Sequence, residues 1–459
     1  MAVFKSWPKP SDMPITAANG KPWNFLILFG DDWPLDVFNE MPGFAATYAA
    51  DFLSFPNAVS EIPLCFPSRA AFQTGQSHRF NTVTSNGSGA TYEAGPINYT
   101  LPVVMQRAGW YVGWVGKIYN GLGEGGGGGW GSLPWQHPGV NYMAGQWGAP
   151  DYFNWDEIGS DGTIRASHGT TDTNVAGTDY AVDVERLRCL EFLDEVPTGR
   201  PWCLIWPSKA CHQGASGGGE PLPPARHTST SVTYTETSNF GADGVALGVE
   251  GNWLTQQRED PWNAGAIAAV RNSHTLALQT ARALDEALVA VLDEIDARGE
   301  TANTVVMICT DNAIAFGELR LNGKGTPHKS GTDLILKVKI PGGETGTCYA
   351  PVCVYDMLPT ICALSGARPL YSPYGMSIHP LLADKAADFR EAVFMNSPDK
   401  KPTFSALKYG GNPGAVYYRI IPGGGLDAST GGWTDLHQTT NVVIAGADAT
   451  LEALENSVA

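Results

Sequence analysis

Four short stretches of the sequence consist almost entirely of apolar residues and end abruptly in glycine or polar residues. They cover residues 24–29, 110–115, 202–206 and 304–309. Apolar runs of this length, without the alternation of a half-exposed strand, are typical of strands that are buried on both faces of a sheet. The pattern therefore predicts four buried strands.

Helical spacing of apolar residues separates these predicted strands. One helix is expected over residues 180–193, with Leu187, Leu190 and Leu193 on one face. Another is expected before Gly299, a suitable C-terminal cap, with apolar side chains at Leu284, Leu288, Val291, Leu292 and Ile295. Strands that alternate with helices predict an α/β fold, in which a mostly parallel central sheet is flanked by helices.

Residues 121–178 depart from this alternation. They are rich in glycine, tryptophan and tyrosine and lack clear periodicity, so we expect a long loop that either faces the substrate or is disordered. Gly121, Gly123 and Gly126 have a dinucleotide-binding spacing, but no helical pattern follows them, and we reject that interpretation.

The pattern changes again near the C-terminus, where short strands and a terminal helix are expected. We therefore predict a large domain over residues 1–384 and a small α+β subdomain, with short antiparallel strands, over residues 385–459.

Charge and composition restrict the partners. The chain of 459 residues is 43% apolar and 16% charged, as expected of a packed globular protein, and its formal net charge is −17. Nucleic acid is not expected as a partner, because its phosphates carry the same sign of charge, and long polyanions are disfavoured for the same reason. No apolar run approaches the length that spans a bilayer, so we expect no membrane partner.

The cysteines indicate a compartment. Cys189, Cys203, Cys309 and Cys362 lie in apolar periodic segments and are expected to be buried free thiols. Such thiols favour the reducing cytoplasm. The first twelve residues lack the apolar core of a secretory signal, and secretion is expected only if such a signal has been removed.

Polar side chains follow all four predicted strands, and carboxyl ends of parallel strands meet at one edge of a sheet. They are Asp31 and Asp32, then Lys117, then Lys209 and His212, and finally Asp311 and Asn312. In isolation the Asp and Asn residues would be interpreted as helix N-caps, and the lysines as surface charges. Together they predict a site for a metal ion and an anion. Oxygen donors alone favour Ca²⁺ or Mg²⁺ over zinc.

The most specific motif is Cys65-Phe66-Pro67-Ser68-Arg69, which leads into a helical pattern. It resembles the Cys-x-Pro-Ser-Arg signature of the formylglycine-dependent (type I) sulfatases of the alkaline phosphatase superfamily. In that family a separate formylglycine-generating enzyme oxidises the cysteine to formylglycine. The alternative for the pentapeptide alone is an ordinary buried cysteine at the start of a helix.

The resemblance covers nearly the whole chain and keeps its order. Asp31-Asp32 is similar to the first metal pair of the family, Gly116-Lys117 to a sulfate-binding stretch, Thr310-Asp311-Asn312 to the second metal pair, and Gly323-Lys324-Gly325-Thr326 to the segment with a second lysine. The resemblance implies an alkaline-phosphatase-like domain and a sulfuric ester hydrolase. It implies catalytic roles for Cys65, Arg69, Lys117, His212 and Lys324, and metal ligation by Asp31, Asp32, Asp311 and Asn312.

Two positions depart from the family pattern. Many members have a histidine two residues after the lysine at 117, whereas Tyr119 stands here, so Asn120 or a remote residue would have to replace it. The family often has proline before the histidine at 212, whereas Cys211 precedes it here.

By resemblance, one hydroxyl of hydrated formylglycine attacks sulfur, the alcohol leaves, and the second hydroxyl helps to expel sulfate. Arg69, Lys117 and Lys324 would hold the sulfate, and His212, assisted by Lys324, would protonate the departing oxygen. We expect a small or short sulfated substrate, with a carbohydrate as one candidate. Trp130, Trp135 and Trp147 would flank the alcohol or simply pack in the loop.

Two rival functions remain open from the sequence. The nearest is a phosphodiesterase or phosphonate monoester hydrolase of the same superfamily, because the same nucleophile can attack tetrahedral phosphorus. The other is a non-catalytic glycan-binding protein in which Cys65 stays unmodified. The complete metal set and both lysines argue against the second, since a pure binder would not need them.

Overall fold

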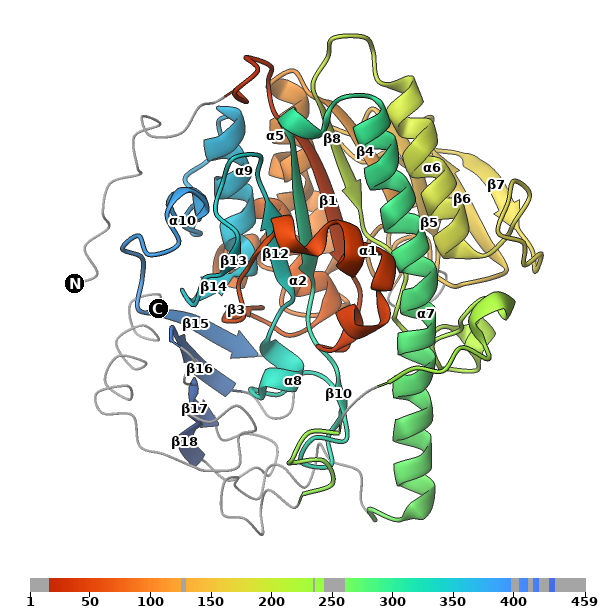
Figure 1. Ribbon diagram of the computed structural model, residues 1–459, viewed down its shortest axis with the longest axis vertical. Coiled ribbons are helices and arrows are strands. Elements are labelled where there is room, and N and C mark those ends of the chain that lie inside the picture. The colour runs from red at the N-terminus through yellow and green to blue at the C-terminus, as the bar shows by residue number, and fades with distance from the viewer. Residues whose placement is uncertain are drawn as a thin grey trace.

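The computed structural model describes residues 16–124, 129–233, 236–242, 261–397, 404–411, 416–420 and 429–433. A ten-stranded sheet with the order β13-β2-β12-β9-β1-β8-β4-β5-β6-β7 forms its centre (Figure 1). The five central strands run parallel and are β9 (Thr304–Thr310), β1 (Asn24–Gly30), β8 (Trp202–Trp206), β4 (Tyr111–Lys117) and β5 (Tyr142–Trp147). The outer strands are β13 (Gly346–Thr347), β2 (Leu53–Ser54), β12 (Leu336–Lys339), β6 (Trp155–Gly159) and β7 (Ile164–His168).

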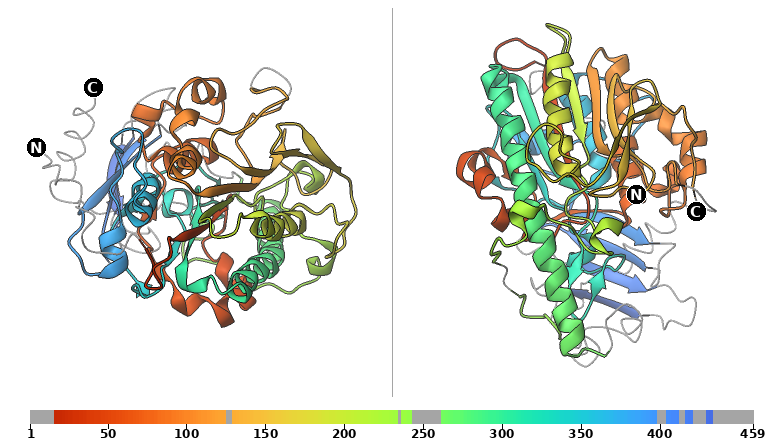
Figure 2. Two further views of the ribbon diagram at one scale, coloured as in Figure 1. Left: turned by 90° about the horizontal axis from the view of Figure 1, so that it is seen from above. Right: turned by 90° about the vertical axis from the view of Figure 1, so that its right-hand side faces the viewer.

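Both faces of the sheet are buried, because successive side chains of a strand point to opposite faces. Along β1, Phe25, Ile27 and Phe29 belong to one apolar cluster, and Leu26 and Leu28 belong to another. The first face is covered by α2 (Cys65–Thr74), α5 (Leu101–Arg107), α9 (Met357–Ser365) and α10 (His379–Ala383). The second is covered by α1 (Pro42–Thr47), α6 (Ala181–Glu195) and α7 (Ala264–Ala297), giving three layers (Figures 1 and 2).

The predicted α/β fold and its four buried strands are confirmed, as β1, β4, β8 and β9. The helix predicted before Gly299 is the C-terminal part of a longer helix, α7. It begins after Asn263, whose side chain accepts hydrogen bonds from the backbone N–H groups of Gly265 and Ala266. Its first turns are rich in alanine and polar residues, so apolar spacing alone does not show them. Among the described residues, no helix is both long and apolar enough to cross a bilayer.

The interpretation of residues 121–178 as a loop is wrong for three stretches. β5, β6 and β7 lie within it and extend the central sheet, with β6 and β7 antiparallel. β5 is interrupted by Gly145 and Gln146, β6 contains Asp156 and Glu157, and β7 reads Ile-Arg-Ala-Ser-His, so no continuous apolar run marks them. Trp130 and Trp135 are 7% and 6% exposed within an aromatic cluster, so packing explains them better than contact with an alcohol.

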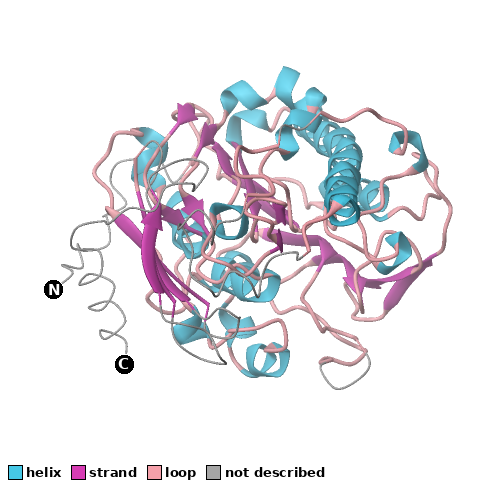
Figure 3. Cartoon of the chain, turned by 90° about the horizontal axis from the view of Figure 1, so that it is seen from below, coloured by secondary structure: helices cyan, strands magenta, loops and turns pink. Residues whose placement is uncertain are grey.

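A second, antiparallel sheet follows in the chain, formed by β15 (Ala392–Ser397), β16 (Phe404–Tyr409), β17 (Val416–Ile420) and β18 (Ser429–Trp433) (Figure 3). Val393, Met395 and Ala406 of this sheet join the main apolar cluster. Lys408, fully buried, pairs with Asp333 at 3.1 Å. The predicted terminal helix lies outside the described residues, and the division at residue 384 stays a prediction. All eight cysteines are buried and free, which confirms the prediction for Cys189, Cys203, Cys309 and Cys362.

The C-terminal end of α2 is fixed by a glycine that no other residue can replace without cost. Gly75 has a φ of 64°, and its carbonyl oxygen accepts hydrogen bonds from the backbone N–H groups of Tyr374 and Gly375. A Cβ atom at Gly75 would lie 2.9 Å from a methyl carbon of Leu358. The position therefore needs both the left-handed backbone and the missing side chain.

We predict that Gly75→Ala lowers the free energy of unfolding by about 2–4 kcal/mol, because backbone strain and overpacking add. Gly299→Ala is the matched control, since Gly299 has a φ of 67° but no heavy atom within 4 Å of the added Cβ. It should cost about 1–2 kcal/mol. Urea denaturation followed by circular dichroism measures both. Equal losses would show that contact with Leu358 contributes nothing.

Candidate active site

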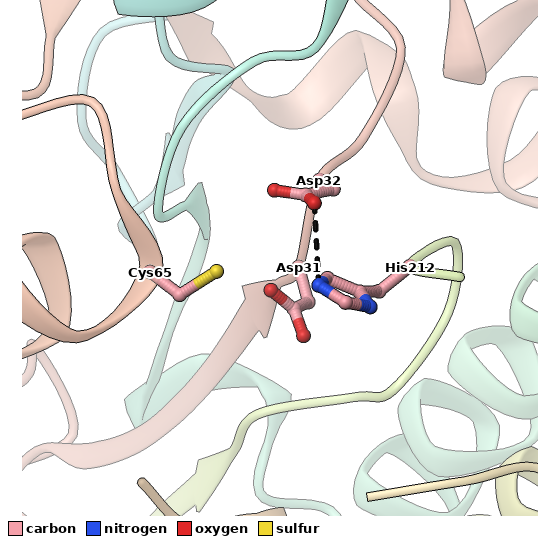
Figure 4. A group of neighbouring side chains, drawn as sticks. All are labelled: Asp31, Asp32, Cys65 and His212. Carbon is pink, nitrogen blue, oxygen red and sulfur yellow. Dashed lines mark ion pairs between the residues drawn. The ribbon is translucent and has the colours of Figure 1, made fainter. Parts of the chain in front are cut away.

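The nine predicted site residues gather at the carboxyl edge of the parallel strands. Asp31 and Asp32 follow β1, Lys117 ends β4, His212 follows β8, and Asp311 and Asn312 follow β9. Cys65 and Arg69 reach the same place from α2, and Lys324 reaches it from the loop after β11 (Asn322–Gly323). Figure 4 shows Cys65, Asp31, Asp32 and His212 around one space. The sequence order of strands and polar ends thus produces a single cluster.

Four buried oxygen-bearing side chains form its floor. Asp31, Asp311 and Asn312 are fully buried, and Asp32 is 5% exposed. Asn312 donates from its amide nitrogen to Asp32 Oδ1 at 2.5 Å, and the backbone N–H of Asp32 donates to Asp311 Oδ1 at 3.3 Å. Asp32 has a φ of 53°, an uncommon backbone conformation for a residue other than glycine. Such strained positions concentrate at functional sites.

Cations from three elements surround these oxygens. Lys117 donates to Asp31 Oδ2 at 2.5 Å, Arg69 donates through Nε to Asp311 Oδ2 at 3.0 Å, and Lys324 donates to Asp32 Oδ1. The close approach of Lys117 depends on the preceding residue. Gly116 has a φ of 102°, and a Cβ there would lie 2.4 Å from the carbonyl oxygen of Pro207 after β8.

The surrounding cations do not lower the pKa of every carboxyl group. Burial raises the pKa of Asp31, but His212, Lys117, Arg69 and Lys324 outweigh it and hold that pKa well below its ordinary value. Burial and the charge of Asp31 instead raise the pKa of Asp311. A third ionised carboxylate is therefore poorly accommodated by the protein groups alone.

The donor set fits a hard divalent cation. Asp31 Oδ1 is buried and has no hydrogen-bond partner, although an Arg69 nitrogen lies 3.5 Å away. One ligand atom from each of Asp31, Asp32, Cys65 and His212 lies within 4.8 Å of the others. Asp311 and Asn312 contact Asp32 directly and add further oxygens. Clustered carboxylate and amide oxygens are what Ca²⁺ and Mg²⁺ prefer.

Cys65 is the first residue of α2, where unpaired backbone N–H groups favour negative charge. Lys324 donates a hydrogen bond to its sulfur at 2.8 Å. Burial nevertheless raises the pKa of the Cys65 thiol to about 12, although Lys324 and Lys117 oppose the shift. The thiol is therefore protonated at neutral pH and is a weak nucleophile as it stands.

His212 lies opposite Cys65 across the carboxylates. Its Nε2 is 3.3 Å from Asp32 Oδ2, its side chain is 19% exposed, and its Nδ1 donates to the carbonyl oxygen of Gln213 at 2.7 Å. Burial lowers its pKa to about 4, against the opposing effect of Asp31 and Asp32.

Lys209 lies in the same cluster, although the family resemblance implies no role for it. It is 2% exposed, and its ammonium lies 2.5 Å from the carbonyl oxygen of Gln213 and 3.2 Å from His212 Nδ1. Burial and the charge of Lys117 lower its pKa to about 8. The sequence signal for Lys209 is its position after β8, at the carboxyl edge of the sheet.

Tyr119, which stands where the resemblance implies a histidine, contacts other side chains. Its hydroxyl accepts from the Tyr92 hydroxyl at 3.0 Å and lies 2.8 Å from His137 Nε2. Because His137 Nδ1 must donate to the Pro138 carbonyl oxygen at 2.7 Å, Tyr119 donates to Nε2. In the described part of the chain, Tyr119 makes no hydrogen bond to Cys65. His137 could not have been found from sequence, since it lies 18 residues away in the glycine-rich segment.

Two curated relatives show what the chain resembles in sequence. It is 25% identical over 339 residues to an N-acetylglucosamine-6-sulfatase of Bos taurus, covering 72% of this chain and 58% of that protein. It is 22% identical over 408 residues to an N-acetylglucosamine-6-O-sulfatase of Bacteroides thetaiotaomicron, covering 75% and 68%. The chain thus spans little more than half the length of the bovine relative.

Solved structures share the fold. A protein in complex with its substrate D-glucosamine-2-N,6-O-disulfate aligns with a TM-score of 0.71 at 18% identity, covering 95% of this chain and 97% of that one. The phosphonate monoester hydrolase of Agrobacterium radiobacter aligns with a TM-score of 0.66 at 16% identity, covering 95% and 94%. At these identities the likeness concerns the fold alone.

The sequence model of one family, described as Sulfatase, matches residues 23–367 of the 459. This span contains all nine predicted site residues. It also contains the five parallel strands at whose carboxyl edge these residues gather. The chain therefore belongs to the sulfatase family.

Proposed function

We propose that this protein is a metal-dependent sulfate ester hydrolase whose nucleophile is made from Cys65. One observation carries the proposal: Cys65 lies beside Lys324 and within 4.8 Å of the ligand atoms of Asp31 and Asp32. Membership of the sulfatase family supports the same reaction. A position that joins a helix N-terminus, cations and carboxylates is suited to attack on a tetrahedral anion.

The cations are proposed to bind the sulfate group. Arg69 and Lys117 are 3% and 1% exposed, so their charges act with little screening by water. Asp31, Asp32, Asp311 and Asn312 would hold Ca²⁺ or Mg²⁺, which supplies a further positive charge at the sulfate when bound. These side chains would then stabilise negative charge that grows on the sulfate oxygens during attack.

The nucleophile itself is proposed to arise by modification. Formylglycine, made from Cys65 by a formylglycine-generating enzyme, would supply a hydroxyl nucleophile in its hydrated form. The protonated thiol explains why the unmodified residue would be a poor substitute. Lys324, already donating to the Cys65 sulfur, would donate to the oxygen that replaces it.

We propose His212, assisted by Lys324, as the acid for the departing alcohol. The Nε2 atom faces the carboxylates, and the side chain is the most exposed of the group in Figure 4. A bound sulfate ester adds negative charge beside the ring and so favours its protonated form. Lys209 would keep the ring in place through Gln213.

A short sulfated carbohydrate is the proposed substrate. The relatives are named as N-acetylglucosamine 6-sulfatases, and a structural neighbour holds a sulfated glucosamine. The net charge of −17 disfavours long sulfated polymers, whose charge has the same sign.

Turnover of para-nitrophenyl sulfate by protein produced with and without a formylglycine-generating enzyme tests this function. We expect turnover only with the enzyme, and peptide mass spectrometry should then find the aldehyde at Cys65. Cys65→Ala should lose activity by about a thousandfold or more, because the nucleophile is removed.

Cys203→Ala is the matched control, since Cys203 is a buried thiol of β8 away from the cluster, and it should retain kcat. Active protein that contains only unmodified Cys65 would contradict the assigned nucleophile. A kcat/KM for bis-para-nitrophenyl phosphate above that for the sulfate would favour the phosphodiesterase alternative.

We predict that His212→Ala slows cleavage of an alkyl sulfate by about 100-fold to 10,000-fold, because an alkoxide leaves poorly without a proton. Activated aryl sulfates should be affected much less, since a phenolate leaves without full proton transfer. Steady-state kcat values on the two substrate types measure the difference.

The control is His227→Ala, which removes a histidine paired with Glu286 at 2.9 Å outside the cluster and should change neither rate. Equal losses on alkyl and aryl sulfates for the His212 variant would instead assign that residue to binding, and the acid would have to be another group.

A further inference from the structure

A cavity of about 710 Å³ lies beside the site but is not part of it. Its volume falls in the range of small-molecule sites. None of the nine site residues lines it, and its walls come from the loop after β1, from β2 and β12, and from α8 (Lys329–Thr332). Aromatic and charged side chains both face it, which is unlike an ordinary packing defect.

Three segments that line the cavity are connected to site residues, either along the chain or by hydrogen bonds. Leu35 follows Asp32 by three residues. Ile335 exchanges hydrogen bonds with Thr310, which precedes Asp311. In α8, the carbonyl oxygen of Gly331 accepts from the backbone N–H of Ala313, which follows Asn312. The cavity therefore adjoins the same edge of the sheet, next to the metal-pair segments.

Lys337 lines the cavity with an ammonium group that forms no ion pair among the described residues. Its ammonium donates to the Ser54 hydroxyl at 2.8 Å and lies 4.9 Å from the ring centre of Phe38. Within the described residues no carboxylate pairs with it, and burial lowers its pKa. A partly buried ammonium held only by neutral groups is suited to an anionic ligand.

The acids of the cavity are already engaged. Asp333 is neutralised by Lys408, and Glu318 accepts a hydrogen bond from the backbone N–H of Phe316 at 2.8 Å. Ser330, 7% exposed, has a buried hydroxyl without a hydrogen-bond partner. Tyr349, 40% exposed, offers a ring at the cavity wall. A free hydroxyl, an ammonium and an aromatic ring together match a sugar that carries an anionic group.

We propose that this cavity binds an anionic sugar unit, a hexuronate or sulfated hexose, joined to the unit whose sulfate ester is cleaved. The proposal rests on the proposed sulfatase function and adds a determinant of substrate choice. Lys337 would pair with the carboxylate or sulfate, and Ser330 would bind a ring hydroxyl. Lys337 would therefore increase the affinity for the neighbouring sugar unit without contacting the reacting sulfur.

The test compares three substrates: sulfated N-acetylglucosamine linked to glucuronate, the same sugar linked to galactose, and para-nitrophenyl sulfate. Lys337→Met should raise KM for the glucuronate disaccharide about tenfold, the loss expected for one charge-assisted hydrogen bond, with kcat unchanged. KM for the other two should stay the same. Free glucuronate should inhibit turnover far more weakly than the glucuronate disaccharide does. Equal inhibition would overturn the proposal that the cavity binds a unit joined to the sulfated sugar.

Lys339→Met is the matched control, because Lys339 lies on the same strand, pairs with Asp51 at 2.7 Å and does not line the cavity. It should change no KM. Equal KM changes for glucuronate and galactose disaccharides, or none, would overturn the proposal. If no sulfate ester is turned over, the sulfatase proposal fails, and calorimetric binding of the glucuronate disaccharide still decides: tenfold weaker binding to Lys337→Met supports the cavity, and equal binding refutes it.

Discussion

The structure depends on the burial of opposite charges at one edge of a parallel sheet. Asp31, Asp32 and Asp311 lie almost without solvent among Arg69 and Lys117, which are buried as well. Buried charges are costly unless each is paired, so these positions tolerate few rearrangements. They are held by the ends of adjacent strands, which are buried on both faces, and by α2, which packs on one face of the sheet. Pairing offsets the cost of burying these charges but adds little net stability, so the arrangement is better suited to binding a ligand than to stabilising the fold.

The helix that carries Cys65, α2, is held in place by contacts of Phe66, Arg69 and Gly75. Arg69 ties it to Asp311, and Gly75 ties its C-terminus to the segment of Tyr374 and Gly375. On its apolar side Phe66 packs in the aromatic cluster that holds Tyr119. Tyr119 thus helps to support this helix, which places Cys65 within reach of Lys324. The same sheet edge also forms the neighbouring cavity around Lys337.

The sequence predicted the parts whose signal is local. Continuous apolar runs identified β1, β4, β8 and β9, and the polar residues that follow these strands lie in one cluster, because strand order places carboxyl ends together. It failed where the signal is not local. The strands β5 to β7 have no continuous apolar run, and the contact of Tyr119 with His137 joins segments without a shared motif. The cavity could not be foreseen, since Ser54 and Lys337 meet only through strand pairing.

Location of a divalent cation in crystals of the wild-type protein, by anomalous scattering, tests the account most directly. We expect one Ca²⁺ or Mg²⁺ ligated by Asp31, Asp32, Asp311 and Asn312, exchangeable for Mn²⁺ as the scatterer, with turnover lost on chelation and restored by the cation. A cation bound elsewhere, or full sulfate ester turnover in a metal-free protein, would contradict it.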